Sequence, residues 1–84
     1  MFWVYVIVNE LGKKYTGQTN DLEIRLKRHN GELASKSGSF TKINRGPWKL
    51  IYKEALESRK AALEREMYLK SHSGREWLKK VLGG

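Results

Sequence analysis

Glu66 has the most informative position for chemistry in the chain. It falls on the inward side of a helix expected from Ser58 to about Lys70, whereas Glu64 points to the opposite side of that helix. An ionised carboxylate directed at an apolar interior is costly unless it meets a cation, hydrogen bonds or a metal ion. Glu66 is therefore a candidate metal ligand, and the alternative is a salt bridge to Arg25 or to another basic side chain under the sheet.

Arg25 and His29 lie four residues apart and share the inward side of a second expected helix. A guanidinium offers a planar fork of donors and an imidazole adds a titratable donor, so the two could grip a phosphate together. The alternative is structural: the arginine lies along apolar surface with its charged end in solvent, and the hydrogen bonds of the histidine are made within the fold. Their position on one helix does not choose between these interpretations.

Two tyrosines in adjacent expected strands add to this group. If Ile7 lies opposite Lys13, Tyr5 lies opposite Tyr15 on the same sheet face, because side chains alternate with a period of two. Taken singly, each is explained by packing. The combination favours chemistry, since five candidate catalytic residues can be placed on one side of a thin sheet: Tyr5, Tyr15, Arg25, His29 and Glu66.

Three strands are expected to form that sheet. The β-branched and aromatic run from Phe2 to Val8 is followed by turn formers, which predicts a strand entering a hairpin with a returning strand over 13–19. The alternation from Trp48 to Ala55 predicts a third, half-buried strand. The basic stretch between Gly31 and Pro47 has no periodicity and reads as a long loop.

Helices are expected in the remaining segments. Asn20 can cap a helix running from Asp21 to about Leu33. Ser58 caps the helix of Glu66, whose apolar stripe consists of Ala62, Leu63, Leu69 and, at its margin, Met67. Gly74 interrupts the pattern, so a short last helix is expected from Arg75 to Leu82.

Composition narrows the partner and the class of chemistry. The 84 residues allow one domain over 1–84, and the absence of cysteine excludes disulfides, thiolate zinc sites and cysteine nucleophiles. The longest apolar run is too short for a membrane helix, so a cytoplasmic protein is expected. With 17 Lys and Arg against nine Asp and Glu, the net charge is +8, which favours a polyanion, with nucleic acid ahead of a membrane surface. The expected backbone contacts come from Lys13, Lys14, Arg28, Lys36, Lys42 and Arg45.

The sequence motifs together resemble a stand-alone GIY-YIG nuclease domain over nearly the whole chain. The segments that carry the resemblance are 4–6, Tyr15-Thr16-Gly17, Arg25 with His29, 47–52 and 62–66. The first motif lacks its glycine and has valine for isoleucine, and the second has threonine at its middle. A larger relative is the N-terminal incision domain of the bacterial nucleotide-excision nuclease, which points to DNA repair.

The resemblance implies a fold, a reaction and residue roles. The implied fold is α/β of the α+β type, a central three-stranded antiparallel sheet flanked by helices. The implied reaction is hydrolysis of DNA phosphodiester bonds with one Mg²⁺ or Mn²⁺ on Glu66. Tyr5 and Tyr15 match the motif tyrosines, Gly17 the second motif's glycine at the nucleic-acid site, and Arg25 with His29 the phosphate contacts. We expect Tyr5 to act as general base, with Tyr15 as second choice; the rival function is a nucleic-acid-binding module that does not cut.

Overall fold

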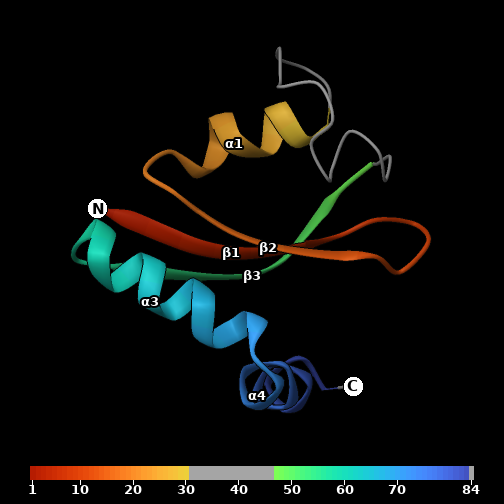
Figure 1. Ribbon diagram of the computed structural model, residues 1–84. Helices are drawn as coiled ribbons and strands as arrows, with labels where there is room; N and C mark the ends of the chain where they lie inside the picture. The colour runs from red at the N-terminus through yellow and green to blue at the C-terminus, as the bar shows by residue number, and fades with distance from the viewer. Residues whose placement is uncertain (31–46, 84) are drawn as a thin grey trace.

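The computed structural model describes residues 1–30 and 47–83. In chain order it contains β1 (Phe2–Val8), β2 (Lys14–Thr19), α1 (Leu22–His29), β3 (Lys49–Leu56), α3 (Arg59–Lys70) and α4 (His72–Leu82). β1 is the central strand and pairs antiparallel with β2 on one side and β3 on the other. Figure 1 shows α1 over one face of the sheet and α3 with α4 on the other side. The predicted three-stranded antiparallel sheet flanked by helices is confirmed.

Alternation along β1 divides the core into two halves. Val4 packs with Ala62 and Leu69 of α3 on one face, whereas Tyr5 and Ile7 pack with Trp48 on the face covered by α1. All of these side chains are buried. Because the sheet is the only layer between the two halves among the described residues, its two faces can carry different functions.

The register of the β1–β2 hairpin differs from the expected one by two residues. Ile7 pairs with Tyr15 rather than with Lys13, and Tyr5 pairs with Gly17 rather than with Tyr15. The buried side chain of Asn9 causes this, because its Oδ1 accepts hydrogen bonds from the backbone N–H groups of Leu11 (3.0 Å) and Lys13 (2.9 Å) and keeps residues 9–13 in the turn. A shift of two preserves the face, so both tyrosines still lie on the same side.

Two contacts fix α1 over the sheet. Asp21, not Asn20, is its N-cap, and the Asp21 side chain accepts from the Ile24 N–H at 3.1 Å. At the other end the Asn30 side chain accepts from the backbone N–H of Trp48 at 2.6 Å and donates to its carbonyl at 3.2 Å. The described part of the helix ends at His29, and Leu33 lies outside the described residues. These contacts hold the inward side of α1 against β1.

α3 begins and ends where the sequence predicts, but its apolar stripe is narrower. Ser58 caps the helix, and Ala62 and Leu69 are buried. The exposed fractions of Leu63 (42%) and Met67 (72%) show that the prediction of an inward position was wrong for both. The reason is that α3 packs on a sheet with three strands only, which covers one narrow side of the helix.

The last helix begins earlier than expected, because Gly74 lies inside it. α4 starts at His72 behind the cap residue Ser71, and Gly74 is buried. A Cβ at residue 74 would lie 1.8 Å from the carbonyl oxygen of Tyr68, so glycine permits α4 to pack tightly against the end of α3. No helix among residues 1–30 and 47–83 is long and apolar enough to cross a membrane.

Candidate active site

A hydrogen-bonded cluster joins β1 to α1 on the α1 face of the sheet. The hydroxyl oxygen of Tyr5 lies 2.7 Å from Nε2 of His29, and Nε of Arg25 donates to the same oxygen at 3.3 Å. The ring of Tyr15 lies 5.0 Å from that of His29 and 6.3 Å from that of Tyr5, between centroids. The structure therefore brings together four of the five residues that the sequence singled out for catalysis.

The direction of one hydrogen bond in this cluster follows from the donors present. Arg25 can only donate to the Tyr5 oxygen. In the contact between Tyr5 and Nε2 of His29 either group can donate, and the tautomer of His29 sets the direction.

Gly17 is required by the packing of the two phenols. A Cβ at this position would lie 2.8 Å from the Tyr5 hydroxyl oxygen and 2.9 Å from Cε2 of Tyr15. Both contacts are closer than real Cβ atoms show. Gly17 is buried, and the absence of a side chain makes room for the tyrosine pair. Its assignment as a nucleic-acid contact stays a prediction.

The surroundings of Tyr5 disfavour its ionisation. Burial raises the pKa of Tyr5 to about 12, since the hydrogen bond from Arg25 only partly offsets the cost of a phenolate there; the negative charges of Tyr15 and Glu66 raise it further. Tyr5 is also fully buried. These features are opposite to those of a general base at neutral pH, and they argue against the first choice made from the sequence.

Arg25 and His29 respond to the same environment in opposite ways. Burial by itself lowers the pKa of Arg25, because it penalises the charged guanidinium. Hydrogen bonds and electrostatic attraction to Tyr5 and Tyr15 outweigh that effect, so the pKa of Arg25 is raised. Burial and, after it, the positive charge of Arg25 lower the pKa of His29 to about 4. At neutral pH the cluster therefore holds a permanent cation beside a neutral imidazole.

The low pKa of His29 predicts a specific dependence of stability on pH. In the unfolded chain the pKa returns to about 6.5, so between pH 6.5 and 4 the unfolded state binds a proton that the folded state does not. The free energy of unfolding is therefore unaffected by His29 above pH 6.5 and falls as the pH decreases toward 4. Urea unfolding over this range should show that His29→Asn removes part of the slope. An NMR titration in which the His29 imidazole protonates near pH 6.5 would contradict the assignment.

Glu66 comes from the opposite side of the sheet. It lies on α3, which packs on the Val4 face, so the expectation that all five residues share one side is corrected. Its negative charge nevertheless raises the pKa of Tyr5, which places it within electrostatic reach of the cluster. The Glu66 side chain is 17% exposed, and its Oε2 accepts from Nζ of Lys70 at 2.6 Å. The salt-bridge alternative is therefore present, with a partner on the same helix and not Arg25.

Lys70 is a residue that sequence reasoning missed. It follows Glu66 by four residues on a predicted helix, a spacing at which opposite charges meet. That signal was available from the sequence alone. The side chain of Lys70 is half exposed, so it can leave the carboxylate without breaking the core.

The residues around Glu66 are compatible with one hard divalent cation. No three His, Cys, Asp or Glu side chains within 1–30 and 47–83 are grouped so that they could hold a metal ion. Mg²⁺ commonly binds through one or two carboxylates plus water and substrate phosphate, so a group of three is not required. A largely buried carboxylate that already attracts a cation, the Lys70 ammonium, fits this donor set.

The basic residues expected to bind nucleic acid are spread over both faces. Lys13 and Lys14 lie at the β1–β2 turn and the start of β2, and Arg28 is exposed on α1. Lys14 lines a pocket on the face opposite α1. Lys36, Lys42 and Arg45 lie outside the described residues. The described cations therefore do not form one patch.

Comparison with known proteins assigns the chain to a family. The GIY-YIG catalytic domain matches residues 1–80, and the chain belongs to this family. Membership indicates nuclease activity in general. Together with the antiparallel sheet and the tyrosine pair, it defines the chain as a small GIY-YIG domain protein.

The similar proteins are small as well. The chain is 34% identical over 82 residues to a UPF0213 protein of Staphylococcus saprophyticus, covering 98% of this chain and 95% of that one. It is 41% identical over 70 residues to a UPF0213 protein of Clostridium perfringens, covering 83% and 71%. The solution NMR structure of a UPF0213 protein from Bacillus halodurans has 31% identity and a TM-score of 0.57, with coverage of 100% and 88%. Fold and family therefore agree.

Proposed function

We propose that this protein is a divalent-metal-dependent endonuclease that hydrolyses phosphodiester bonds in DNA, directed by the structure of the substrate and not by its sequence. The observation that carries the proposal is the hydrogen-bonded cluster of Tyr5, Arg25 and His29, with Tyr15 against it, in a chain of the GIY-YIG catalytic-domain family. The reaction is in-line attack of water on phosphorus with departure of the 3′ oxygen.

Arg25 is the residue that neutralises the phosphate in this proposal. Its Nε donates to Tyr5, which orients the guanidinium, and the N–H groups that are not bonded to Tyr5 or Tyr15 can donate to a phosphate. A positioned cation gains most where negative charge increases in the transition state, on the equatorial phosphate oxygens. His29, neutral and hydrogen-bonded to the same phenol, holds that phenol in place.

Tyr15 is the better candidate for the general base. It is only partly buried, whereas Tyr5 is fully buried with a pKa raised to about 12. A phenol can take a proton from water at neutral pH only where cations favour the phenolate. Tyr15 has a hydrogen bond with Arg25 and lines a pocket with Lys70 and Arg75. We therefore assign proton abstraction to Tyr15 and positioning of the cluster to Tyr5.

Glu66 is the residue that would hold Mg²⁺ or Mn²⁺. A metal ion bound there would supply charge stabilisation to the phosphate and to the departing 3′ oxygen. Lys70 would leave the carboxylate when the metal binds, and its half-exposed side chain can then turn to solvent or to the DNA backbone. Glu66 would thus exchange one cation for another.

Binding to DNA is expected to depend strongly on salt and weakly on sequence. Each phosphate contact contributes a slope of about −0.9 to the logarithm of affinity against the logarithm of salt concentration. Replacing Lys13 and Lys14 by alanine should therefore reduce the measured slope by up to roughly two. Fluorescence anisotropy on several duplexes between low and high salt checks this, and an affinity that stays constant over the range would refute backbone-dominated binding.

A second candidate function is a nucleic-acid-binding module of the same fold that does not cut. The ion pair between Glu66 and Lys70 favours it, because the carboxylate already has a protein partner. Binding data cannot separate the two functions, whereas strand cleavage can. An assay on branched, flapped, single-stranded and duplex DNA with Mg²⁺, Mn²⁺ or EDTA decides: we expect metal-dependent cuts on at least one structured substrate, and intact strands in every lane would favour the binding module.

A further inference from the structure

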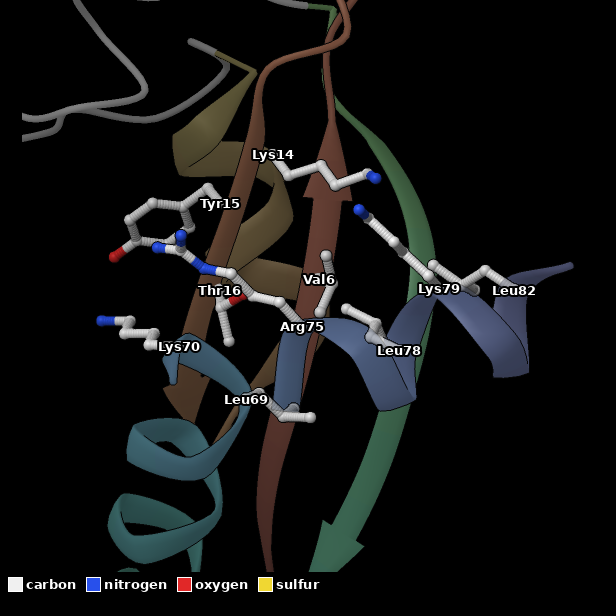
Figure 2. Close-up of a pocket in the computed structure, with 10 residues that line it drawn as sticks. All are labelled: Val6, Lys14, Tyr15, Thr16, Leu69, Lys70, Arg75, Leu78, Lys79 and Leu82. Carbon is white, nitrogen blue, oxygen red and sulfur yellow. The ribbon is translucent and has the colours of Figure 1, made fainter. Parts of the chain in front are cut away.

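The pocket lined by Lys14 and Tyr15 lies on the sheet face opposite the Tyr5 cluster. It has a volume of about 480 Å³ and is formed by β1, β2, the end of α3 and α4 (Figure 2). This volume is within the range of about 300 to 1,000 Å³ typical of sites for small organic ligands. The pocket is therefore large enough for more than a single inorganic ion.

The polar part of the lining is cationic. Four of the lining residues are basic and none is acidic: Lys14, Lys70, Arg75 and Lys79. Figure 2 shows the ammonium groups of Lys14 and Lys79 pointing toward each other. Like charges that converge repel one another, and an anion between them removes the repulsion. The pocket thus has the electrostatics of an anion-binding site.

Two of these cations already have weak partners, and two do not. Lys70 pairs with Glu66, and Lys79 lies 3.8 Å from Glu76 in an exposed contact. Among the described residues, neither Lys14 nor Arg75 has a carboxylate within 4.0 Å. The charges of Lys14 and Arg75, and that of the loosely paired Lys79, are therefore available to a ligand.

The remaining lining is apolar and forms a floor beneath the cations. It consists of Val6, Leu69, Leu78 and Leu82. Val6, Leu69 and Leu78 are buried, and Leu82 is the partly exposed member of the four. A phosphate alone would leave an apolar floor uncovered, whereas a nucleotide offers a flat base for the floor and a phosphate for the cations.

The pocket is connected to the candidate active site through two shared residues. Tyr15 lines the pocket and also packs on His29. Lys70 lines the pocket and also pairs with Glu66. A chain of nucleotides whose scissile phosphate lies at Arg25 and Glu66 would therefore pass the edge of β2 directly into this pocket.

We propose that the pocket binds one unpaired nucleotide of the substrate next to the bond that is cut, with its base on the apolar floor and its phosphate between Lys14 and Lys79. A base can enter a pocket of this kind only when it is not paired, so the substrate class is DNA with an unpaired strand beside the cut. This inference rests on the proposed nuclease function for its biological meaning, but not for its binding test.

The test is an NMR titration of the ¹⁵N-labelled protein, without divalent metal, using thymidine 5′-monophosphate, thymidine and inorganic phosphate as separate probes. The monophosphate should shift the backbone amides of Thr16, Leu78 and Lys79 and bind more tightly than either fragment. Lys79→Ala should weaken it by about tenfold, since one charge-assisted contact is lost. Lys80→Ala, with the same charge change one residue away and outside the lining, should keep wild-type affinity.

The results separate the two proposals. No shifts, shifts confined to the Tyr5 and His29 region, equal affinity for phosphate and the monophosphate, or equal effects of the two lysine variants would each overturn the pocket assignment. In a parallel cleavage assay, wild type should prefer a duplex with an unpaired extension to a blunt duplex, and Lys79→Ala should lose that preference. Specific monophosphate binding without cleavage of any DNA would refute the nuclease function but support the nucleotide pocket. Cleavage of DNA without monophosphate binding would support the nuclease function but refute the pocket.

Discussion

Replacing Arg25 with alanine is expected to reduce the rate of DNA cleavage by roughly a hundred- to a thousandfold, the effect of removing one preorganised donor to transition-state charge. The fold should survive. Arg25 is only partly buried, and without it the Tyr5 hydroxyl keeps its hydrogen bond to His29. Loss of the 3.3 Å contact to Tyr5 should cost about 1 kcal/mol in the free energy of unfolding.

Two further variants, Arg25→Lys and Lys27→Ala, test whether cleavage requires the guanidinium of Arg25 or only a positive charge on α1. Lysine keeps the charge but cannot both hold Tyr5 and present further donors to a phosphate, so Arg25→Lys should cut little better than the alanine variant. Lys27 is an exposed cation on the same helix, paired loosely with Glu23 at 3.9 Å, and its replacement should leave cleavage nearly unchanged. Single-turnover rates at saturating protein measure all three. If either Arg25 variant cut at the wild-type rate, Arg25 would be a structural residue.

Glu66→Ala is expected to abolish metal-dependent cleavage while the protein stays folded and binds DNA. The ion pair it breaks is between neighbours on one helix, and the Lys70 side chain is half exposed, so the loss of stability should be about 0.5 kcal/mol or less. Removal of the Glu66 charge also relieves its effect on the pKa of Tyr5. Thermal melts together with cleavage rates check both halves of this expectation.

Glu64→Ala is the matched control for that variant. Glu64 lies two residues away on α3 and is exposed, and it should affect neither cleavage nor metal binding. Line broadening of amide signals by Mn²⁺ gives a readout other than activity: it should be centred near residue 66 in the wild type and in Glu64→Ala, and absent in Glu66→Ala. If a Glu66→Ala protein melted far below the wild type but still cleaved DNA, the ion pair between Glu66 and Lys70 would have a structural role only, and Glu66 would not be the metal ligand.

The sequence predicted the elements well because strong local signals mark them. Ser58 and the alternation of apolar residues define α3 and β3 within a residue or two. The register of the hairpin could not be predicted, since it depends on which backbone N–H groups donate hydrogen bonds to the Asn9 side chain. The start of α4 was missed because glycine usually ends a helix, whereas Gly74 is needed for a tertiary contact with Tyr68 that no local pattern reports.

The proximity of four of the five candidate residues was predicted from the sequence, whereas the position of Glu66 across the sheet and the electrostatics of the cluster were not. Periodicity was sufficient to place Tyr5, Arg25 and His29 together. The raised pKa of Tyr5 depends on the depth at which its phenol lies and on its hydrogen bond with Arg25, and both follow from the packing of α1 over the sheet. The pocket opposite α1 draws lysines and arginine from three separate elements, so spacing along the chain gives no signal of it.

The central claim, hydrolysis of a phosphodiester by water at this site, has one direct measurement. Structured DNA is incubated with the protein and Mn²⁺ in ¹⁸O-labelled water, and the termini of the products are analysed by mass spectrometry. Attack of water on phosphorus with loss of the 3′ oxygen predicts 3′-hydroxyl ends and 5′-phosphates that carry one ¹⁸O atom, in amounts that fall at least a hundredfold with Arg25→Ala. Strands that stay intact although the folded wild-type protein binds them, or cleaved strands without ¹⁸O in the 5′-phosphate, would contradict the account.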